Sequence, residues 1–189
     1  MYYEKEQAAE LFKYWNKRIA EFTLPEWDEL PVFEVYMDQV VTLMNEYLDI
    51  YSEVNSNTKG ITPSMINNYV KLKIIPAPIK KKYSRIHLAY LIIVCVLKQT
   101  LSISSVQSII PPDLTEDEVK AIYSSFVKNQ HKSYSYVSES IDQIANSIFV
   151  NENGKPERIN DLIIQVASSA NIFKLISENI LGNSKNEEE

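Results

Sequence analysis

The sequence is poor in glycine, with three glycines against eight prolines in 189 residues. Barrels, propellers and doubly wound folds use glycine in their turns and phosphate-binding loops, so this composition argues against them. Hydrophobic residues make up 45% of the chain and charged residues 23%, which supplies enough apolar material for a folded core. We therefore expect a mainly α-helical protein whose helices are joined by proline-marked turns.

Cysteine is almost absent, because Cys95 is the single one. This excludes an internal disulfide framework and a zinc site built from paired thiolates. Cys95 lies among apolar residues and is expected to be a core thiol, while His87 and His131 lack a second ligand at metal-binding spacing, so we expect no metal and no cofactor. No run approaches the roughly 20 apolar residues of a membrane span, and the first residues are charged where a secretory signal is apolar. We expect a cytoplasmic protein without membrane association.

Acidic residues are missing from the whole middle of the chain. Residues 1–53 carry 12 acids and 4 bases, residues 54–112 carry no acid and 8 bases, and residues 113–189 carry 13 acids and 7 bases. The composition alone would place about eight acids in the middle window. The net charge of −6 therefore conceals a basic segment, defined here as residues 54–112, whose surface suits a polyanion.

Periodicity and turn residues divide the chain into three parts. Residues 1–34 predict an amphipathic helix and a proline-rich connector in which Trp27 is a buried plug. Residues 35–112 predict a helix capped by Asp38, a polar loop, and the helices of the basic segment.

The third part, residues 113–189, begins with a capping box formed by Thr115 and Glu118. One long helix or two follow, then a last helix from Pro156 to Gly182 and a solvated acidic tail. The acids beside Glu118 stand where a helix dipole favours negative charge, so a catalytic pair there is not expected.

The basic segment contains a short helix with a clear start. Thr62 and Pro63 form an N-cap and first-turn pair, and the inward stripe of the predicted helix is Ile66, Tyr69 and Val70. The outward face would carry Ser64, Asn67, Asn68 and Lys71. A proline-interrupted, lysine-rich stretch follows, and Ser84 then caps a strongly apolar helix that ends near Leu97.

This order of elements is typical of a winged helix-turn-helix, in which the second helix enters the major groove and the wing touches the phosphate backbone. Asn67 and Asn68 carry amides that can pair with an adenine edge. Phosphate charge would be supplied by Lys71, Lys73, Lys80, Lys81, Lys82 and Arg85.

A family resemblance agrees with this interpretation. The stretch ITPSMINNYVKLKIIPAPIKKKYSRIHLAYLIIVCVLKQTLSISSVQSII resembles the DNA-binding domain of MerR-type regulators, and LPEWDELP, YMDQVV and SMINNYVK resemble domain-of-unknown-function family 1836 (DUF1836), bacterial MerR-like transcription regulators. The resemblance implies a recognition helix at about 62–73 and a basic wing at about 76–85. The DNA-contacting residues it implies are Thr62, Ser64, Asn67, Asn68, Lys71, Lys73, Lys80, Lys81, Lys82, Tyr83 and Arg85.

MerR-type proteins dimerise through a long helix after the DNA domain, which the resemblance places at residues 115–150. We therefore expect a homodimeric, sequence-specific regulator that binds double-stranded DNA. The resemblance to MerR-type regulators implies no effector-binding residue in this sequence. The sequence contains no phosphate loop, nucleophile elbow or metal-ligand spacing, so we expect no enzymatic activity. The alternative is an interaction module whose basic segment docks on an acidic protein partner.

Overall fold

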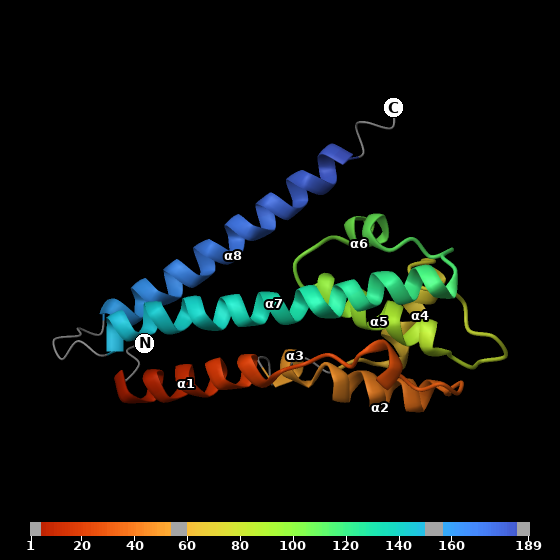
Figure 1. Ribbon diagram of the computed structural model, residues 1–189, viewed down its shortest axis with the longest axis horizontal. Coiled ribbons are helices and arrows are strands. Elements are labelled where there is room, and N and C mark those ends of the chain that lie inside the picture. Colours follow the sequence, from red (N-terminus) through yellow and green to blue (C-terminus); the bar gives the residue numbers. More distant parts are fainter. Residues whose placement is uncertain (1–4, 54–59, 150–156, 185–189) are drawn as a thin grey trace. The chain divides into compact units, whose positions relative to one another are not determined.

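The computed structural model describes residues 5–53, 60–149 and 157–184, and they are almost entirely helical (Figure 1). Within these residues the chain forms eight α-helices, one 3-10 helix and no extended strand. Residues 23–129 form one compact unit, called the central unit, and residues 1–22 with 130–189 form a second, called the terminal unit. The expectation of a mainly helical protein is confirmed.

The central unit is built around one helix that is buried on all sides. The α5 helix (Arg85–Leu97) buries ten consecutive side chains from His87 to Val96, as its apolar sequence RIHLAYLIIVCVL predicts. Around it lie η1 (Trp27–Glu29), α2 (Met37–Tyr47), α3 (Asp49–Glu53), α4 (Pro63–Lys71), α6 (Ile103–Ile109) and the first part of α7 (Glu116–Phe149).

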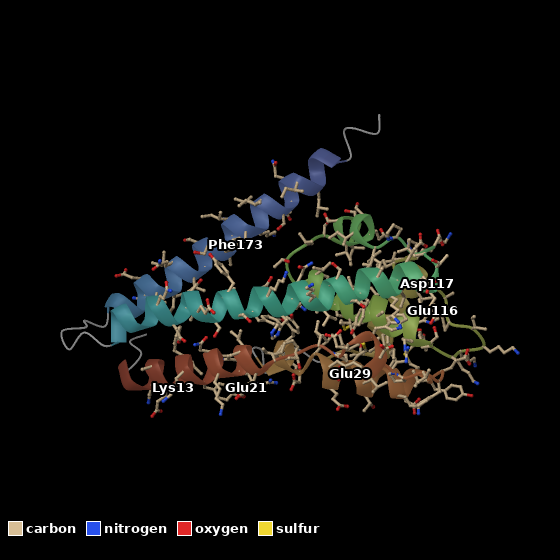
Figure 2. All side chains as sticks on the ribbon, in the orientation of Figure 1. Lys13, Glu21, Glu29, Glu116, Asp117 and Phe173 are labelled. Carbon is tan, nitrogen blue, oxygen red and sulfur yellow. The ribbon has the colours of Figure 1, made fainter. Side chains whose placement is uncertain are left out.

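Polar residues at helix starts fix where these helices begin. The Ser102 hydroxyl accepts a hydrogen bond of 3.1 Å from the Ser105 N–H and starts α6. The predicted capping box at the start of α7 is present: the Thr115 N–H donates to the Glu118 carboxylate at 2.8 Å, and the Glu118 N–H donates back to the Thr115 hydroxyl at 3.4 Å. Two hydrogen bonds from Thr115 lower the pKa of Glu118. Glu116 and Asp117 lie in the same first turn (Figure 2), where negative charge stabilises a helix.

Trp27 is buried, as the sequence predicts, and it joins the connector to the central unit. Its ring contacts Tyr123 of α7 edge to face at 6.1 Å, and the Tyr123 hydroxyl donates to the Pro25 carbonyl at 2.7 Å. Residues 23–34 therefore pack with the central unit. The boundaries of the two compact units differ from those of the three segments expected from the sequence. The reason is that α7 is a single helix whose residues belong to both units.

The terminal unit comprises α1 (Lys5–Glu21), the later part of α7 and α8 (Glu157–Ser184). The α1 helix lies along α7, since the Ser138 hydroxyl donates to the Asn16 side chain at 2.7 Å and Phe22 contacts the Tyr134 ring at 5.4 Å. The stretch that the sequence left open as one helix or two is the single helix α7.

Two predicted helix ends are wrong. The α2 helix begins at Met37 with Tyr36 as N-cap, and Gln39, not Asp38, completes the start by accepting the Tyr36 N–H at 2.9 Å. The α8 helix continues through Gly182 and ends at Ser184. The predicted loop at 54–59, the turn at 150–156 with Pro156, and the tail at 185–189 lie outside the described residues.

None of the described helices combines the length and the apolar character that a membrane span requires.

Candidate nucleic-acid interface

The helix α4 presents a polar face to solvent, as its sequence predicts. Thr62 is the N-cap, and its hydroxyl accepts the Met65 N–H at 3.3 Å. Ile66 and Tyr69 are buried against the central unit. The side chains on the other face are exposed: Ser64, Asn67, Asn68 and Lys71. Because no acid lies in this face, it presents amides, a hydroxyl and a cation to an approaching ligand.

Asn45 of α2 holds the start of α4 in place. Its Oδ1 accepts the Ile61 N–H at 2.8 Å, and its Nδ2 donates to the Ile61 carbonyl at 3.1 Å and to the Val41 carbonyl at 2.8 Å. Gly60 is required beside this amide, because a Cβ there would lie 2.1 Å from Asn45 Oδ1. Sequence reasoning missed Asn45, because no local pattern marks its hydrogen bonds to Ile61, which lies 16 residues later in the chain.

The end of α4 is a Schellman motif that has lysine in place of glycine. The Ile74 N–H donates to the Tyr69 carbonyl at 2.9 Å and the Lys73 N–H to the Val70 carbonyl at 3.0 Å, which are the two bonds of that motif. Lys73 takes the left-handed position with a φ of 54°. Glycine adopts this conformation without steric cost, whereas lysine adopts it only at a steric cost.

The predicted wing is a hairpin of two lysines. Ile79 and Lys82 exchange both backbone hydrogen bonds, at 3.1 and 2.9 Å, around Lys80 (φ 50°) and Lys81 (φ 65°). Positive φ at both central residues is the type I′ geometry, which favours Asn-Gly. Both lysines are exposed, and this segment projects beyond the helices of the central unit (Figure 1).

A second backbone pairing anchors the hairpin to the central unit. Val35 and Tyr83 exchange hydrogen bonds of 2.9 and 2.8 Å, and both side chains are buried. Tyr83 thus packs in the core, with its ring edge to face with His87 at 5.5 Å, and its side chain does not reach the surface. The hairpin therefore stands on a rigid base.

Arg85 is also held inside the central unit. Its Nη2 donates to the Leu30 carbonyl at 2.9 Å, its guanidinium lies 5.4 Å from the Trp27 ring centroid, and its Nη1 lies 3.8 Å from the Asp28 carboxylate. Its side chain is 15% exposed. The structure gives Arg85 and Tyr83 a packing role, which sets them apart from the exposed lysines.

His87 is a buried packing residue. Its Nδ1 accepts the Ser84 N–H at 3.0 Å, so its Nε2 carries the proton and donates to the Ala77 carbonyl at 3.3 Å. Burial lowers the pKa of His87. Cys95 is buried in α5, and burial raises the pKa of its thiol to about 12, so it stays protonated.

The lysines of the basic segment are mostly free of carboxylates. Among the described residues, no acid lies within ion-pair distance of Lys71, Lys73, Lys80 or Lys81, whereas Lys82 lies 3.6 Å from Glu34. Lys98 was not singled out from the sequence; its ammonium lies 5.6 Å from the Tyr69 ring centroid, beside α4. No group of three metal-ligating side chains occurs in the part of the chain that the structure describes.

A family model described as Domain of unknown function (DUF1836) matches residues 25–137. The match spans more than half of the chain and contains α2 to α6, including α4 and the lysine hairpin. No curated protein matches the chain. No solved structure matches it.

Proposed function

We propose that this chain, which belongs to the DUF1836 family, is a sequence-specific transcription regulator that binds double-stranded DNA through a MerR-like winged helix-turn-helix. In this proposal α2 and α4 are the helix pair, α4 is the recognition helix and the hairpin at Ile79–Lys82 is the wing. The wing and the end of α4 supply cations to the phosphate backbone, and the outer face of α4 supplies base contacts.

The observation that carries the proposal is the backbone conformation of three lysines. Lys73, Lys80 and Lys81 are the only described non-glycine residues with positive φ, and all three are exposed in the acid-free basic segment. A left-handed non-glycine residue costs on the order of 1 kcal/mol, which glycine or asparagine would reduce. Lysine at these positions adds charge at the expense of stability, and strain of this kind gathers at functional sites.

The α4 face supplies the polar groups that base recognition needs. The Asn67 and Asn68 amides can donate and accept together at the N6 and N7 of adenine, and Ser64 and Thr62 lie at the helix start, where phosphate oxygens are bound by backbone N–H groups. Tyr83 and Arg85 receive no DNA contact in this proposal, because Tyr83 is buried in the core and the Arg85 guanidinium is held by the Leu30 carbonyl and the Asp28 carboxylate.

Two copies of the chain would read a pseudo-palindrome. Recognition helices that enter successive major grooves on one face of DNA lie about 34 to 36 Å apart. If three to five phosphates are neutralised per copy, affinity falls by orders of magnitude between low and physiological salt.

The test removes the wing charge and improves the turn in one step. The variant K80N/K81G places the preferred Asn-Gly pair in the type I′ hairpin, so its free energy of unfolding should rise by about 1 kcal/mol or more. Its affinity for fluorescent duplex should nevertheless fall on every sequence, and the slope of log K against log salt should decrease by about 2. The matched control K128Q/K132Q removes two exposed lysines of α7 and should leave both quantities unchanged.

Each outcome decides between the regulator and the interaction module. A stabilised variant that loses DNA binding cannot owe its loss to unfolding, and wild-type preference for duplex from the gene's own upstream region over scrambled duplex would establish sequence reading. Weak binding without preference, equal in K80N/K81G and the control, would reject the regulator. It would favour the alternative, an acidic protein partner for the same basic segment.

A further inference from the structure

The described part of the terminal unit buries very few side chains. Among its residues whose burial the structure describes, only Phe22, Ser138 and Leu162 are buried, whereas α5 of the central unit buries ten in succession. A helix in water is stabilised mainly by packing of its apolar face, so the helices of this unit require a covering surface.

The α8 helix carries the largest uncovered apolar surface. Its exposed large apolar side chains are between 37% and 65% exposed. They are Ile163, Ile164, Val166, Ile172, Phe173, Leu175, Ile176 and Ile180. Phe173 projects from the middle of the helix (Figure 2). A helix that is apolar on most of its circumference is normally buried in a larger assembly.

The spacing of these side chains is a heptad repeat. The a positions are Val166, Phe173 and Ile180, the d positions are Leu162, Ser169 and Ile176, and five of these six are apolar. This pattern, called here the α8 seam, runs from Leu162 to Ile180, almost three heptads, in a helix about 42 Å long. A seam of this period fits another helix with the same period.

Between Leu162 and Ile180 the flanking e and g positions of the α8 seam carry no charge, and the one charged residue of α8 in a flanking register is Arg158, a g position ahead of the seam. The e positions are Ile163, Ala170 and Ser177, and the g positions are Gln165, Ile172 and Asn179. The charged residues Asp161, Lys174 and Glu178 fall on the remaining positions, where Lys174 and Glu178 pair with each other at 3.9 Å. Charges at e and g select oppositely charged partners and repel like ones, so an uncharged flank imposes no electrostatic barrier on pairing with itself.

We propose that the α8 seam is a self-association surface that pairs with the α8 seam of a second copy of this chain. Its biological role, bringing two recognition helices onto one operator, rests on the proposed function; the pairing itself rests on the burial and charge pattern of α8. The sequence predicts a dimerisation or effector region over residues 113–189, with residues 115–150 as a candidate dimer helix, and this proposal assigns dimerisation to α8 within that region.

The apolar area exposed on the α8 seam approaches the area that a small stable dimer buries. The six exposed apolar side chains at and beside the seam leave roughly 60 to 120 Å² each to water, or about 400 to 700 Å² per copy. A monomeric protein seldom leaves a patch larger than roughly 300 to 600 Å² uncovered, and standard interfaces bury about 800 Å² on each side. Two α8 seams together would bury about 800 to 1,400 Å², which overlaps the lower end of the roughly 1,200 to 2,000 Å² of specific interfaces.

The experiment measures the mass of the full chain by sedimentation equilibrium. Wild type should sediment at twice the chain mass of 21.8 kDa. The variant F173E/I180E, with charges at two a positions, should dissociate, its dimer dissociation constant rising roughly 100-fold or more. The matched control N160E/N171E adds the same charge on the polar side of α8 and should remain dimeric. The conservative variant F173L/I180L keeps both a positions apolar and should also remain dimeric. This would show that dissociation of F173E/I180E comes from the added charge and not from substitution at these positions.

The outcomes are distinct from those of the DNA experiment, because no DNA is present. A monomeric wild type, a larger assembly, or a dimer that survives F173E/I180E would overturn the α8 seam. A dimer that dissociates in F173E/I180E alone, with helical circular dichroism retained, supports it even if the chain binds no DNA. Conversely, a monomer that binds DNA would reject the seam and leave the regulator in place.

Discussion

At the residue scale, Gly60 and Asn45 form a contact that tolerates no side chain at position 60. The Asn45 amide cannot move away from an added Cβ, because it holds three hydrogen bonds to Ile61 and Val41. We expect Gly60→Ala to lower the free energy of unfolding by about 1 to 3 kcal/mol in urea titrations.

Two variants check this cause. Gly182→Ala meets open space in α8 and should leave stability unchanged or raise it slightly, since alanine is the better helix former. In an Asn45→Ala background the cost of Gly60→Ala should become small. A cost that persists there would mean that the hydrogen-bonded amide is not the obstacle.

His87 should make the stability of the fold depend on pH. Its pKa is lowered by burial, so the folded chain takes up a proton less readily than the unfolded chain, whose histidine has the ordinary pKa of 6.5. The contribution of the neutral ring is therefore complete above pH 6.5 and is lost as the pH falls below it. Urea unfolding at pH 7.5 and 5.5 should show lower stability at the acidic pH.

The quantity to compare among variants is the difference in the free energy of unfolding between pH 7.5 and pH 5.5. His87→Gln should reduce the difference between the two pH values, while His131→Gln, a change at an exposed position of α7, should leave it intact. An undiminished difference in His87→Gln would assign the pH dependence to other groups.

The residue scale also marks where sequence reasoning ends. The exposure of Asn67, Asn68 and Lys71 follows from helical spacing alone, because Ile66 and Tyr69 fix the buried face. The left-handed lysines could not be found in this way, since lysine is not a residue that indicates positive φ. The burial of Tyr83 and Arg85 was equally hidden, because it depends on Val35, Leu30 and Trp27, which lie about 50 residues earlier in the chain.

At the scale of the element, α4 should separate base reading from phosphate binding. Replacement of Asn67 or Asn68 by alanine keeps the helix, since alanine is the best helix former and both positions are exposed. Each replacement should cost about 1 to 3 kcal/mol on the preferred duplex and far less on scrambled duplex, as measured by fluorescence anisotropy. An equal loss on every sequence would refute base reading by these amides.

Helix starts were predictable where a side chain makes the cap, and less so where tertiary pairing decides. Thr62 and Thr115 each cap the helix expected of them. The start of α2 differs, because the backbone pairing of Val35 with Tyr83 holds residue 35 extended and lets the helix begin directly after it. No local pattern in the sequence announces a pairing partner 48 residues away.

At the scale of the whole molecule, the two proposals fall on different compact units. The recognition helix and the wing belong to the central unit, and the α8 seam belongs to the terminal unit. Single chains that cannot pair should therefore retain the phosphate and base contacts of one half-site. What they lose is the second binding event, which pairing makes intramolecular.

This separation predicts how F173E/I180E should bind DNA. On a duplex with one half-site, its affinity should equal that of wild type within a few-fold, because every proposed DNA-contacting residue is intact. On a pseudo-palindrome with half-sites 10 to 10.5 base pairs apart, wild type should bind 100-fold or more tightly than it binds one half-site, and F173E/I180E should lose this gain. Insertion of about 5 base pairs between the half-sites turns them to opposite faces of the DNA, so it should remove the gain from wild type as well. A variant weakened equally on the single half-site would show that the α8 seam supports the recognition fold itself, and pairing would then not be its function.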